Sequence, residues 1–398
     1  MLLRCMVGLY HHQLNIELCQ GAQMNTRFHR IAFAMLLGLS YAAWSADIQV
    51  DTTADENDGS CQDGDCSLRD AVAVAESGDR ILVPAGQFKV SSNPIAPRVS
   101  VEIVGVGPQL TIIDGDGSTG VISIDGFEST ESELRVNLSK LTVTNGVASR
   151  GGGIRYRNAV GRISDCVVRN SAGFNGGGVT ADSISEVIIE RCAILDNLAD
   201  GNSGAGVLVN TSSVLIIDST ISGNDAPSSG RVGGGIAVFG DKDFALATLV
   251  VRNSTIFGNS AAGEGGGIFL SEDGSTVEIS NSVIANNSGG DCSMAMSSLG
   301  WNLDSDGSCG LTSTGDLPSS DPDLGSLALN GGATLNFLPN PTSPLIDAGN
   351  PAAPDGGTSS CTALDQRGLI IAANDICDIG AVESDGADLP VFSDRFEG

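Results

Sequence analysis

The sequence predicts an all-β solenoid, a parallel β-helix, and three observations support this prediction. Glycine makes up 53 of the 398 residues, which is about twice its usual share, whereas aromatic residues contribute only 4%. Glycine clusters recur through the middle of the chain, and short β-branched segments that end in asparagine alternate with them. No segment of helical length shows apolar residues at a spacing of three to four. We therefore expect many short strands separated by turns.

The two signals recur between about residues 140 and 290. The glycine clusters, each followed by Ile or Val, lie at 151–154, 176–179, 204–207, 233–236 and 265–268. The aliphatic segments end at Asn145, Asn170, Asn197, Asn224, Asn259 and Asn286. Successive clusters start 25 to 32 residues apart and successive asparagines are 25 to 35 apart. Self-similarity with a period of roughly 20–50 residues is typical of solenoids.

One repeat matches one coil of a parallel β-helix. Two or three short strands fit into such a period, and equivalent strands of neighbouring coils stack about 4.8 Å apart with their aliphatic side chains inside. Glycine permits turns with positive φ, and asparagine tolerates the left-handed conformation while it bonds locally and to its neighbour in the next coil.

The N-terminus is expected to be a targeting segment. Residues 24–46 contain Arg27 and Arg30, an apolar run over 31–39 and small residues up to Ala46, which is the pattern of a secretory signal peptide. The apolar run is shorter than the roughly 20 residues that a membrane span needs, and no other stretch of spanning length follows. Residues 1–23 are interpreted as an upstream extension with a misassigned start; the alternative is an unusually long charged region of the signal.

Cleavage near Ala46 would remove every histidine, because His11, His12 and His29 all precede it. The mature chain would then lack an imidazole for a Ser-His-Asp triad, a Cys-His pair or a His-liganded zinc site. With 20 Lys and Arg against 48 Asp and Glu, the formal charge is −28. This charge argues against binding to nucleic acid or to an anionic membrane, because phosphate contacts need clustered Lys and Arg.

Eight cysteines remain beyond the signal peptide, and an even number in an exported chain indicates disulfides. Their order along the chain suggests the pairs Cys61–Cys66, Cys166–Cys192, Cys292–Cys309 and Cys361–Cys377. Other pairings are open, and some of these residues could instead be buried free thiols. Cys166 and Cys192 occupy equivalent places in consecutive repeats, so stacking predicts a bridge or a buried sulfur pair there.

Motifs at both ends of the chain resemble known bacterial proteins. Residues 61–88, with Cys-Ser-Leu-Arg-Asp-Ala at 66–71 followed by the segment 78–88, resemble the opening of exported proteins with a Cys-Ser-Leu-Arg-Glu-Ala motif, although Asp70 stands where Glu is usual. Residues 104–115 are similar to the first coils of pectin-lyase-like right-handed β-helices. Segments at 330–335, 344–349, 365–368 and 377–383 resemble the closing module of surface-sorted β-helix proteins with variable anchors. The resemblance implies a single-stranded right-handed parallel β-helix on or outside the cell.

The expected organisation follows from these features. An N-terminal cap and first coil occupy 47–100, with a short helix that starts after Ser67 and covers the strand edges. The β-helix repeats occupy 101–291, an irregular disulfide-bearing C-terminal cap occupies 292–383, and a linker with a short tail occupies 384–398.

The search for catalytic residues yields a weak set. Polysaccharide lyases on this scaffold use Arg or Lys as a base beside carboxylates, and the candidates here are Arg155, Arg157, Arg169, Arg191 and Asp165. Alternation places Arg155 and Arg157 on one face if Ile154 points inward. The alternative is that all these groups are solvated surface charges. No Asp-Asp pair, Gly-His-Gly or Arg-x-Pro-x-x-Arg motif supports the lyase interpretation.

Calcium is the only cofactor that the sequence suggests. Six oxygen-bearing residues crowd the region before the predicted helix: Asp51, Asp55, Asn57, Asp58, Asp63 and Asp65. Such a loop can bind Ca²⁺, or it can be a solvated acidic turn. A regular repeat without a catalytic signature predicts a secreted or cell-surface monomer that binds carbohydrate or another surface polymer in an adhesin-like manner. The alternative hypothesis is a lyase or hydrolase of an acidic glycan.

Overall fold

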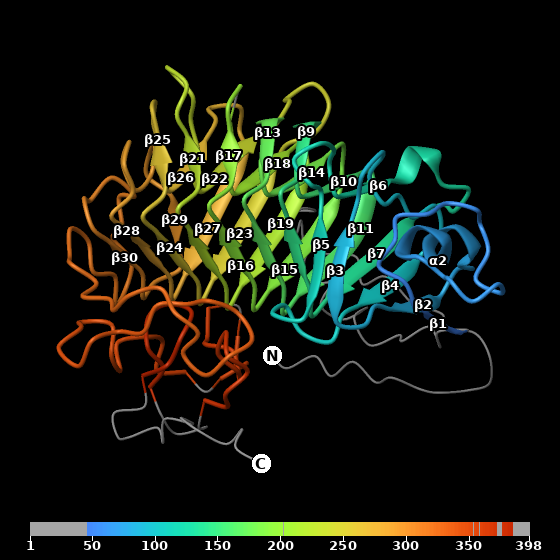
Figure 1. Cartoon of the computed structure of the whole chain (residues 1–398). Coiled ribbons are helices and arrows are strands. Elements are labelled where there is room, and N and C mark those ends of the chain that lie inside the picture. Colours follow the sequence, from blue (N-terminus) through green and yellow to red (C-terminus); the bar gives the residue numbers. More distant parts are fainter. Residues whose placement is uncertain (1–45, 202, 353, 358, 372–375, 385–398) are drawn as a thin grey trace, which may run out of the picture. The chain divides into compact units, whose positions relative to one another are not determined.

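The described part of the chain is a β-helix in which the central coils pass through four parallel sheets in turn (Figure 1). The computed structural model describes residues 46–201, 203–352, 354–357, 359–371 and 376–384. The predicted extension (1–23), almost all of the signal peptide (24–46) and almost all of the tail (384–398) lie outside these residues. The predicted fold class, mostly parallel β with one short α-helix, is confirmed.

We number the sheets I to IV in the order in which the chain visits them. Sheet I contains β1 (Asp47–Gln49), β2 (Asp79–Leu82), β4 (Val101–Val104), β7 (Leu134–Ser139), β11 (Ala159–Ser164), β15 (Glu186–Glu190), β19 (Ser213–Ile217), β23 (Thr248–Arg252), β27 (Thr276–Ser280) and β29 (Ser297–Ser298). Sheet II contains β3 (Gly86–Lys89), β5 (Thr111–Asp114), β8 (Thr142–Thr144), β12 (Val167–Arg169), β16 (Ala193–Leu195), β20 (Thr220–Ser222), β24 (Thr255–Phe257), β28 (Val283–Ala285) and β30 (Leu303–Asp304). Sheet III contains β9 (Val147–Arg150), β13 (Ala172–Asn175), β17 (Leu198–Ala199), β21 (Asp225–Ala226) and β25 (Ser260–Ala261). Sheet IV contains β6 (Ile122–Asp125), β10 (Ile154–Arg157), β14 (Val179–Asp182), β18 (Val207–Asn210), β22 (Ile236–Phe239) and β26 (Ile268–Leu270).

Aliphatic side chains stack in register inside the coil. In sheet I, Ile163, Ile189, Ile216, Val251 and Ile279 are aligned across five consecutive strands, and each is 0% exposed. Because side chains of a strand alternate between its two faces, every second residue points out of the coil. Each sheet therefore has an outer face whose side chains also line up from coil to coil.

The repeated asparagines occupy two neighbouring positions rather than one. Asn145, Asn170 and Asn286 have φ between 52° and 56° and form the left-handed corner after a sheet II strand. Asn197 and Asn224 lie one position further on and point inward, where the Asn197 backbone N–H donates to Asn224 Oδ1 over 3.0 Å. The sequence analysis expected one asparagine both to adopt the left-handed conformation and to bond to the next coil. In the structure, two adjacent residues divide these roles.

The N-terminal end of the coil is covered by α2 (Leu68–Val74). Its predicted cap is present, since Ser67 Oγ accepts a hydrogen bond from the Asp70 backbone N–H over 3.1 Å. Leu68 and Ala71 are buried in the same core as the first coils. Neither α2 nor the 3₁₀ helix η1 (Gly126–Glu128) among the described residues has the length and apolar character needed to cross a bilayer.

The C-terminal segment, residues 324–384, does more than continue the end of the coil. Residues up to 323 still contribute β29 and β30, which pair with β27 and β28. The segment then returns along the outer face of sheet II, where Gln366 accepts a hydrogen bond from Thr220 over 2.6 Å and donates to the Cys192 carbonyl over 3.2 Å. Leu345 and Ile379 pack against Val283 and Leu303. The expected cap is therefore a lateral cover, and the outer face of sheet II is largely occupied by the chain itself.

The described residues contain the disulfides Cys61–Cys66, Cys292–Cys309 and Cys361–Cys377. The predicted bridge between Cys166 and Cys192 is wrong, because both residues are buried free thiols. They precede strands that pair in register, so their side chains run parallel about 4.8 Å apart, beyond the Cβ–Cβ separation of about 3.8 Å that a disulfide needs. Each thiol donates to a backbone carbonyl instead, Cys166 to Ser164 and Cys192 to Glu190.

Candidate functional site

The structure separates the five candidate catalytic residues. Arg155 and Arg157 lie on the outer face of sheet IV, and Arg169 belongs to sheet II. Arg191 lies at the corner between sheets I and II, where its Nε is 2.9 Å from Asp165 Oδ1. Asp165 and Arg191 both have positive φ at this corner. The five residues therefore do not form one site, and Arg191 with Asp165 is a pair that links neighbouring coils.

The outer face of sheet IV carries arginine, carboxylate and aromatic side chains. In β10, Ile154 and Tyr156 are 0% exposed in the core, so Arg155 and Arg157 point outward. The same alternation applies to every strand of the sheet because the strands are in register. We define the sheet IV face as the outward residues Ser123, Asp125, Arg155, Arg157, Thr180, Asp182, Leu208, Asn210, Ala237, Phe239 and Phe269.

The arginines on this face are held by carboxylates of the neighbouring coils. Arg155 donates through Nε and Nη2 to Asp182 Oδ2 over 3.1 and 2.8 Å, and Asp182 is 1% exposed. Arg157 Nη1 lies 3.0 Å from Asp125 Oδ2, and its guanidinium sits 4.7 Å from the centre of the Phe127 ring. Arg150 Nη1 approaches the same Asp182 oxygen at 3.7 Å. The result is two neighbouring Arg–Asp ion pairs, with Arg150 close to one of them.

Phenylalanines lie on the sheet IV face and along its two long edges. Phe239 and Phe269 lie on the face with ring centroids 5.3 Å apart. Phe127 and Phe244 stand on the connections from sheet IV to sheet I, and Phe174 stands on β13 of the neighbouring sheet III. They are 59%, 62% and 55% exposed, and they are the only phenylalanines exposed among the described residues. We call these three residues the rim.

Sequence reasoning missed Asp125, Asp182 and all of these phenylalanines. The signal was present, because the face residues follow the aliphatic residue after each glycine cluster by one and three positions. Alignment of the repeats on the glycine clusters would have put Arg157, Asp182, Asn210 and Phe239 in one column.

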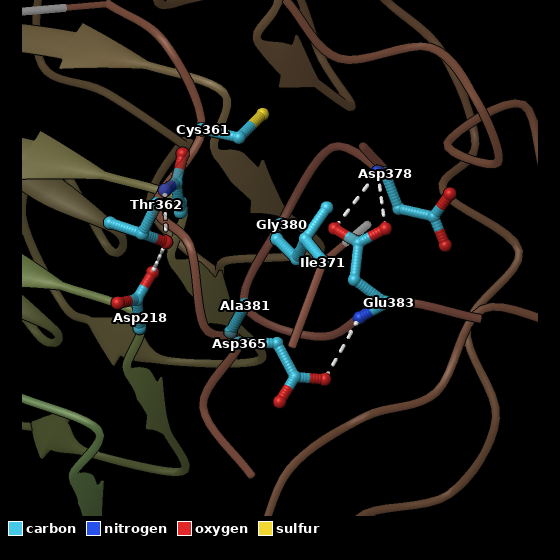
Figure 2. Close-up of a pocket in the computed structure, with 10 residues that line it drawn as sticks. Asp218, Cys361, Thr362, Asp365, Ile371, Asp378, Gly380, Ala381 and Glu383 are labelled. Atoms are coloured by element: carbon cyan, nitrogen blue, oxygen red, sulfur yellow. Dashed lines mark hydrogen bonds between the residues drawn. The ribbon is translucent and has the colours of Figure 1, made fainter. Parts of the chain in front are cut away.

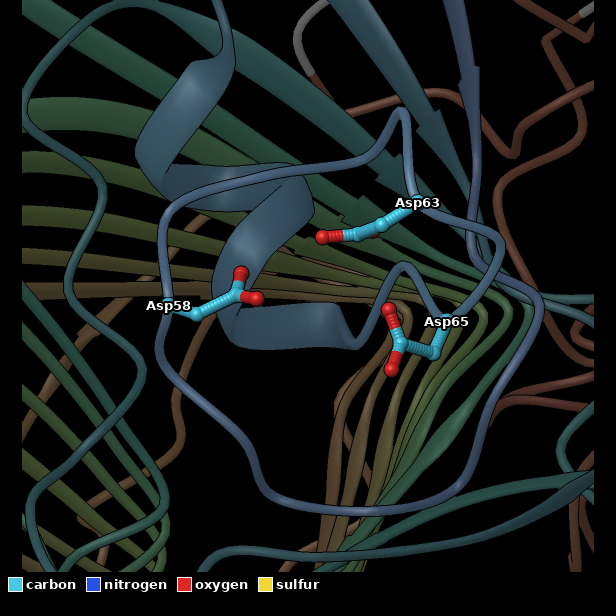
Figure 3. A group of neighbouring side chains, drawn as sticks. All are labelled: Asp58, Asp63 and Asp65. Atoms are coloured by element: carbon cyan, nitrogen blue, oxygen red, sulfur yellow. The ribbon is translucent and has the colours of Figure 1, made fainter.

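The acidic loop before α2 brings together part of the predicted calcium set (Figure 3). Carboxylate oxygens of Asp58, Asp63 and Asp65 lie within 4.8 Å of one another, and all three residues are exposed. A hydrogen bond with Asp63 and the charge of its carboxylate raise the pKa of Asp65 to about 6. Three carboxylates are a donor set that suits a hard cation such as Ca²⁺.

The remaining predicted ligands do not join this group. Asp55 is 2.9 Å from Arg69 Nη2 and accepts hydrogen bonds from the backbone and hydroxyl of Ser91. Asp51 lies outside the group, and Asn57 directly precedes Asp58 in the loop. The loop thus offers three carboxylates rather than a six-residue cage.

A second acidic cluster lies where the C-terminal segment meets the coil (Figure 2). Thr362 Oγ1 donates to Asp218 Oδ1 over 2.6 Å, and the Asp378 backbone N–H donates to Glu383 over 3.1 Å. Burial raises the pKa of Asp218 and of Glu383 to about 8. The space between these residues is too small to admit water, so the cluster is a packed contact rather than a substrate site.

Comparison with known proteins bears on the fold. Residues 113–302 match a family model described as a right-handed β-helix region. Among solved structures, the crystal structure of pectate lyase Pel9A is 14% identical, with 85% of this chain and 96% of that chain covered at a TM-score of 0.43. ORF18 of Geobacillus virus E2 is also 14% identical, with 77% and 66% covered at a TM-score of 0.37. No curated protein matches this chain. Residues 113–302 are thus a right-handed β-helix region.

Proposed function

We propose that the protein is an exported carbohydrate-binding protein whose ligand lies on the sheet IV face. The observation that carries the proposal is the combination of two Arg–Asp pairs across β6, β10 and β14 with Phe239 and Phe269 on the same face and the exposed rim beside it. Positions on this face repeat from coil to coil at the strand spacing of about 4.8 Å, although Thr180, Asp182, Leu208 and Ala237 are themselves buried. Such a repeat suits a linear polymer that runs along the axis of the coil.

The side chains match the chemistry of a sugar. Guanidinium groups donate and carboxylates accept hydrogen bonds in fixed planes, so an Arg–Asp pair can bind neighbouring hydroxyl groups. Exposed aromatic rings offer apolar surface to the C–H faces of a sugar ring. Exposed aromatic residues that gather at one face are typical of a binding surface rather than of ordinary protein exterior.

The lyase hypothesis has less support. A guanidinium that acts as a base must be free to take a proton from the substrate, whereas Arg155 and Arg157 already donate hydrogen bonds to carboxylates over 2.8 and 3.0 Å. An assay for unsaturated products from a uronate polymer in the presence of Ca²⁺ tests this alternative directly.

An extracellular location and a monomeric state belong to the proposal. Three disulfides support an oxidising compartment, and the resemblance of both ends to exported and surface-sorted proteins supports the cell exterior. The domain organisation is also part of the proposal. The N-terminal cap remains at 47–100 and the repeats at 101–291. The C-terminal module expected at 292–383 includes the segment that covers sheet II.

Binding is tested with Arg157→Ala and a matched control on another sheet. Arg157 and Asp125 have side chains 40% and 16% exposed, and the Arg162–Glu190 pair of sheet I is closely similar at 47% and 17%. Loss of charged hydrogen bonds should weaken retention in polysaccharide-containing gels about tenfold for Arg157→Ala, whereas Arg162→Ala should match the parent.

Phe244→Ala, at an exposed rim position, should also weaken retention. The thermal unfolding midpoint of each variant establishes that it is folded. Failure of every polysaccharide to retard the parent protein, or equal losses for Arg157→Ala and Arg162→Ala, would contradict the proposed function.

A further inference from the structure

We infer that the polymer bound by the sheet IV face is uncharged, an inference that rests on the proposed function. The positive charges of the face are already compensated within the protein, and the apolar rim and the charge of the whole chain disfavour a polyanion. Each of these points is independent of the others.

The first point is that the described face presents no unpaired guanidinium. Asp182 holds Arg155 and approaches Arg150, and Asp125 holds Arg157. An anionic sugar would have to compete with Asp182, which is only 1% exposed. Displacement of a buried carboxylate from its arginine leaves an uncompensated buried charge, which costs several kcal/mol.

The second point is an unused acceptor. Asp182 Oδ2 accepts from Arg155, whereas Asp182 Oδ1 is buried without a hydrogen-bond partner. This oxygen can only accept a hydrogen bond, so the ligand group that suits it is a donor such as a sugar hydroxyl. A uronate carboxylate or a sulfate has no proton to donate there and would add repulsion.

The third point concerns the surroundings of the face. The chain carries a formal charge of −28, which repels a polyanion at distances within a Debye length. The exposed phenylalanines of the rim gain most from apolar ligand surface, and ionised groups resist the desolvation that such contact requires. A neutral polysaccharide is not repelled by the negative chain, and it offers apolar surface to the phenylalanines of the rim.

The test compares three polymers at two ionic strengths. A soluble neutral β-glucan, polygalacturonate and a sulfated polysaccharide are titrated into the protein at low salt and at about 0.5 M salt. We expect binding of the neutral glucan with less than about a twofold change between the two salt concentrations, and at least about tenfold weaker binding of both polyanions at low salt.

The two proposals fail in different ways. Preference for polygalacturonate or the sulfated polymer at low salt would overturn this inference while the proposed function stands. Absence of binding to every polymer would overturn the proposed function itself.

A charge-release variant sharpens the test. Asp125→Asn removes the carboxylate that compensates Arg157, so affinity for polygalacturonate at low salt should rise severalfold and fall again at high salt. Glu190→Gln is the control, because it releases Arg162 on sheet I and also removes the contact of Glu190 with Arg191, and it should leave polygalacturonate binding unchanged. Because both positions are partly exposed, thermal unfolding should show both variants folded. If Asp125→Asn and Glu190→Gln changed the affinity for polygalacturonate equally, the conclusion that Asp125 compensates a positive charge on the sheet IV face would be overturned.

Discussion

One inward side chain in each coil ties the turn between sheets II and III to the next turn. Asn197, Asn224 and Asn259 form this asparagine ladder, in which each side chain accepts from the backbone N–H of the preceding member and donates to the side chain of the next. The third glycine of each cluster packs on the ladder: a Cβ on Gly178 would lie 2.9 Å from Asn197 Nδ2 and 2.6 Å from the Gly206 carbonyl oxygen. Glycine and asparagine therefore recur together because they are in contact.

The ladder predicts a large cost for one substitution. Asn224→Ala would leave the Asn197 backbone N–H and the Ile194 carbonyl without the buried partners that Asn224 provides at 3.0 Å each. With a penalty of about 1–3 kcal/mol for each unsatisfied buried group, the free energy of unfolding should fall by roughly 3–4 kcal/mol. Equilibrium unfolding in guanidinium chloride measures this loss.

Asn93→Ala, in an exposed turn, is the control and should change the free energy of unfolding by less than about 0.5 kcal/mol. A similar small effect for Asn224→Ala would show that the ladder is not a major source of stability.

At the scale of elements, the most distinctive contact is the C-terminal segment on sheet II. Asp218 of the coil is 3% exposed and faces Thr362, Asn253, Arg191, Arg252 and Glu190. Glu383 of the segment faces Asp378, Asp365 and Arg367. Burial also raises the pKa of Asp378. The contact thus buries more carboxylates than it has partners to neutralise.

These carboxylates predict that docking of the segment weakens as the pH rises. Burial raises the pKa of Asp218 and Glu383 to about 8, above the ordinary value of about 4, so the docked state binds more protons than the undocked state between these values. Docking is then most stable below about pH 4 and loses of the order of 1.4 kcal/mol per pH unit for each group up to about pH 8.

Trp301, which packs beside Leu345 and Ile379, reports the change. In a Trp44→Phe background it is the sole tryptophan, and its fluorescence should shift to longer wavelength as the pH rises from about 5 to 9. Asp218→Asn should reduce the shift, whereas Asp243→Asn, in an exposed turn, should not. An emission maximum that stays constant over this range would refute the prediction.

At the scale of the whole molecule, the repeat and the departures from it have different origins. The period of the glycine clusters predicted the coil, because each coil contacts mainly the coils one period away. The cover of sheet II follows no period: Thr220 and Gln366 are 146 residues apart, and nothing in either local sequence indicates the other. For the same reason the sequence indicated Arg155 and Arg157 but not the phenylalanines of the rim, of which Phe127 and Phe244 stand in connections of unequal length and Phe174 on β13.

The cover predicts the effect of two truncations. Removal of 324–398 would expose an apolar strip of sheet II that includes Val167, Leu195 and Val283, which the intact chain buries. The shortened protein should aggregate in light-scattering and size-exclusion measurements, and removal of 385–398 alone should leave a monodisperse protein. A monodisperse, equally stable 1–323 fragment would contradict this role.

The coil that contains β22 differs in length from its neighbours. Asn224 and Asn259 are 35 residues apart, whereas Asn197 precedes Asn224 by 27 and Asn287 follows Asn259 by 28, yet β18, β22 and β26 remain in register. The surplus is accommodated at 227–231 and 240–246, in the connections before the stacked glycine cluster 233–235 and before the buried Ala247. Evolution or an engineer can therefore lengthen, shorten or exchange these connections to alter ligand preference while the scaffold beneath keeps its shape.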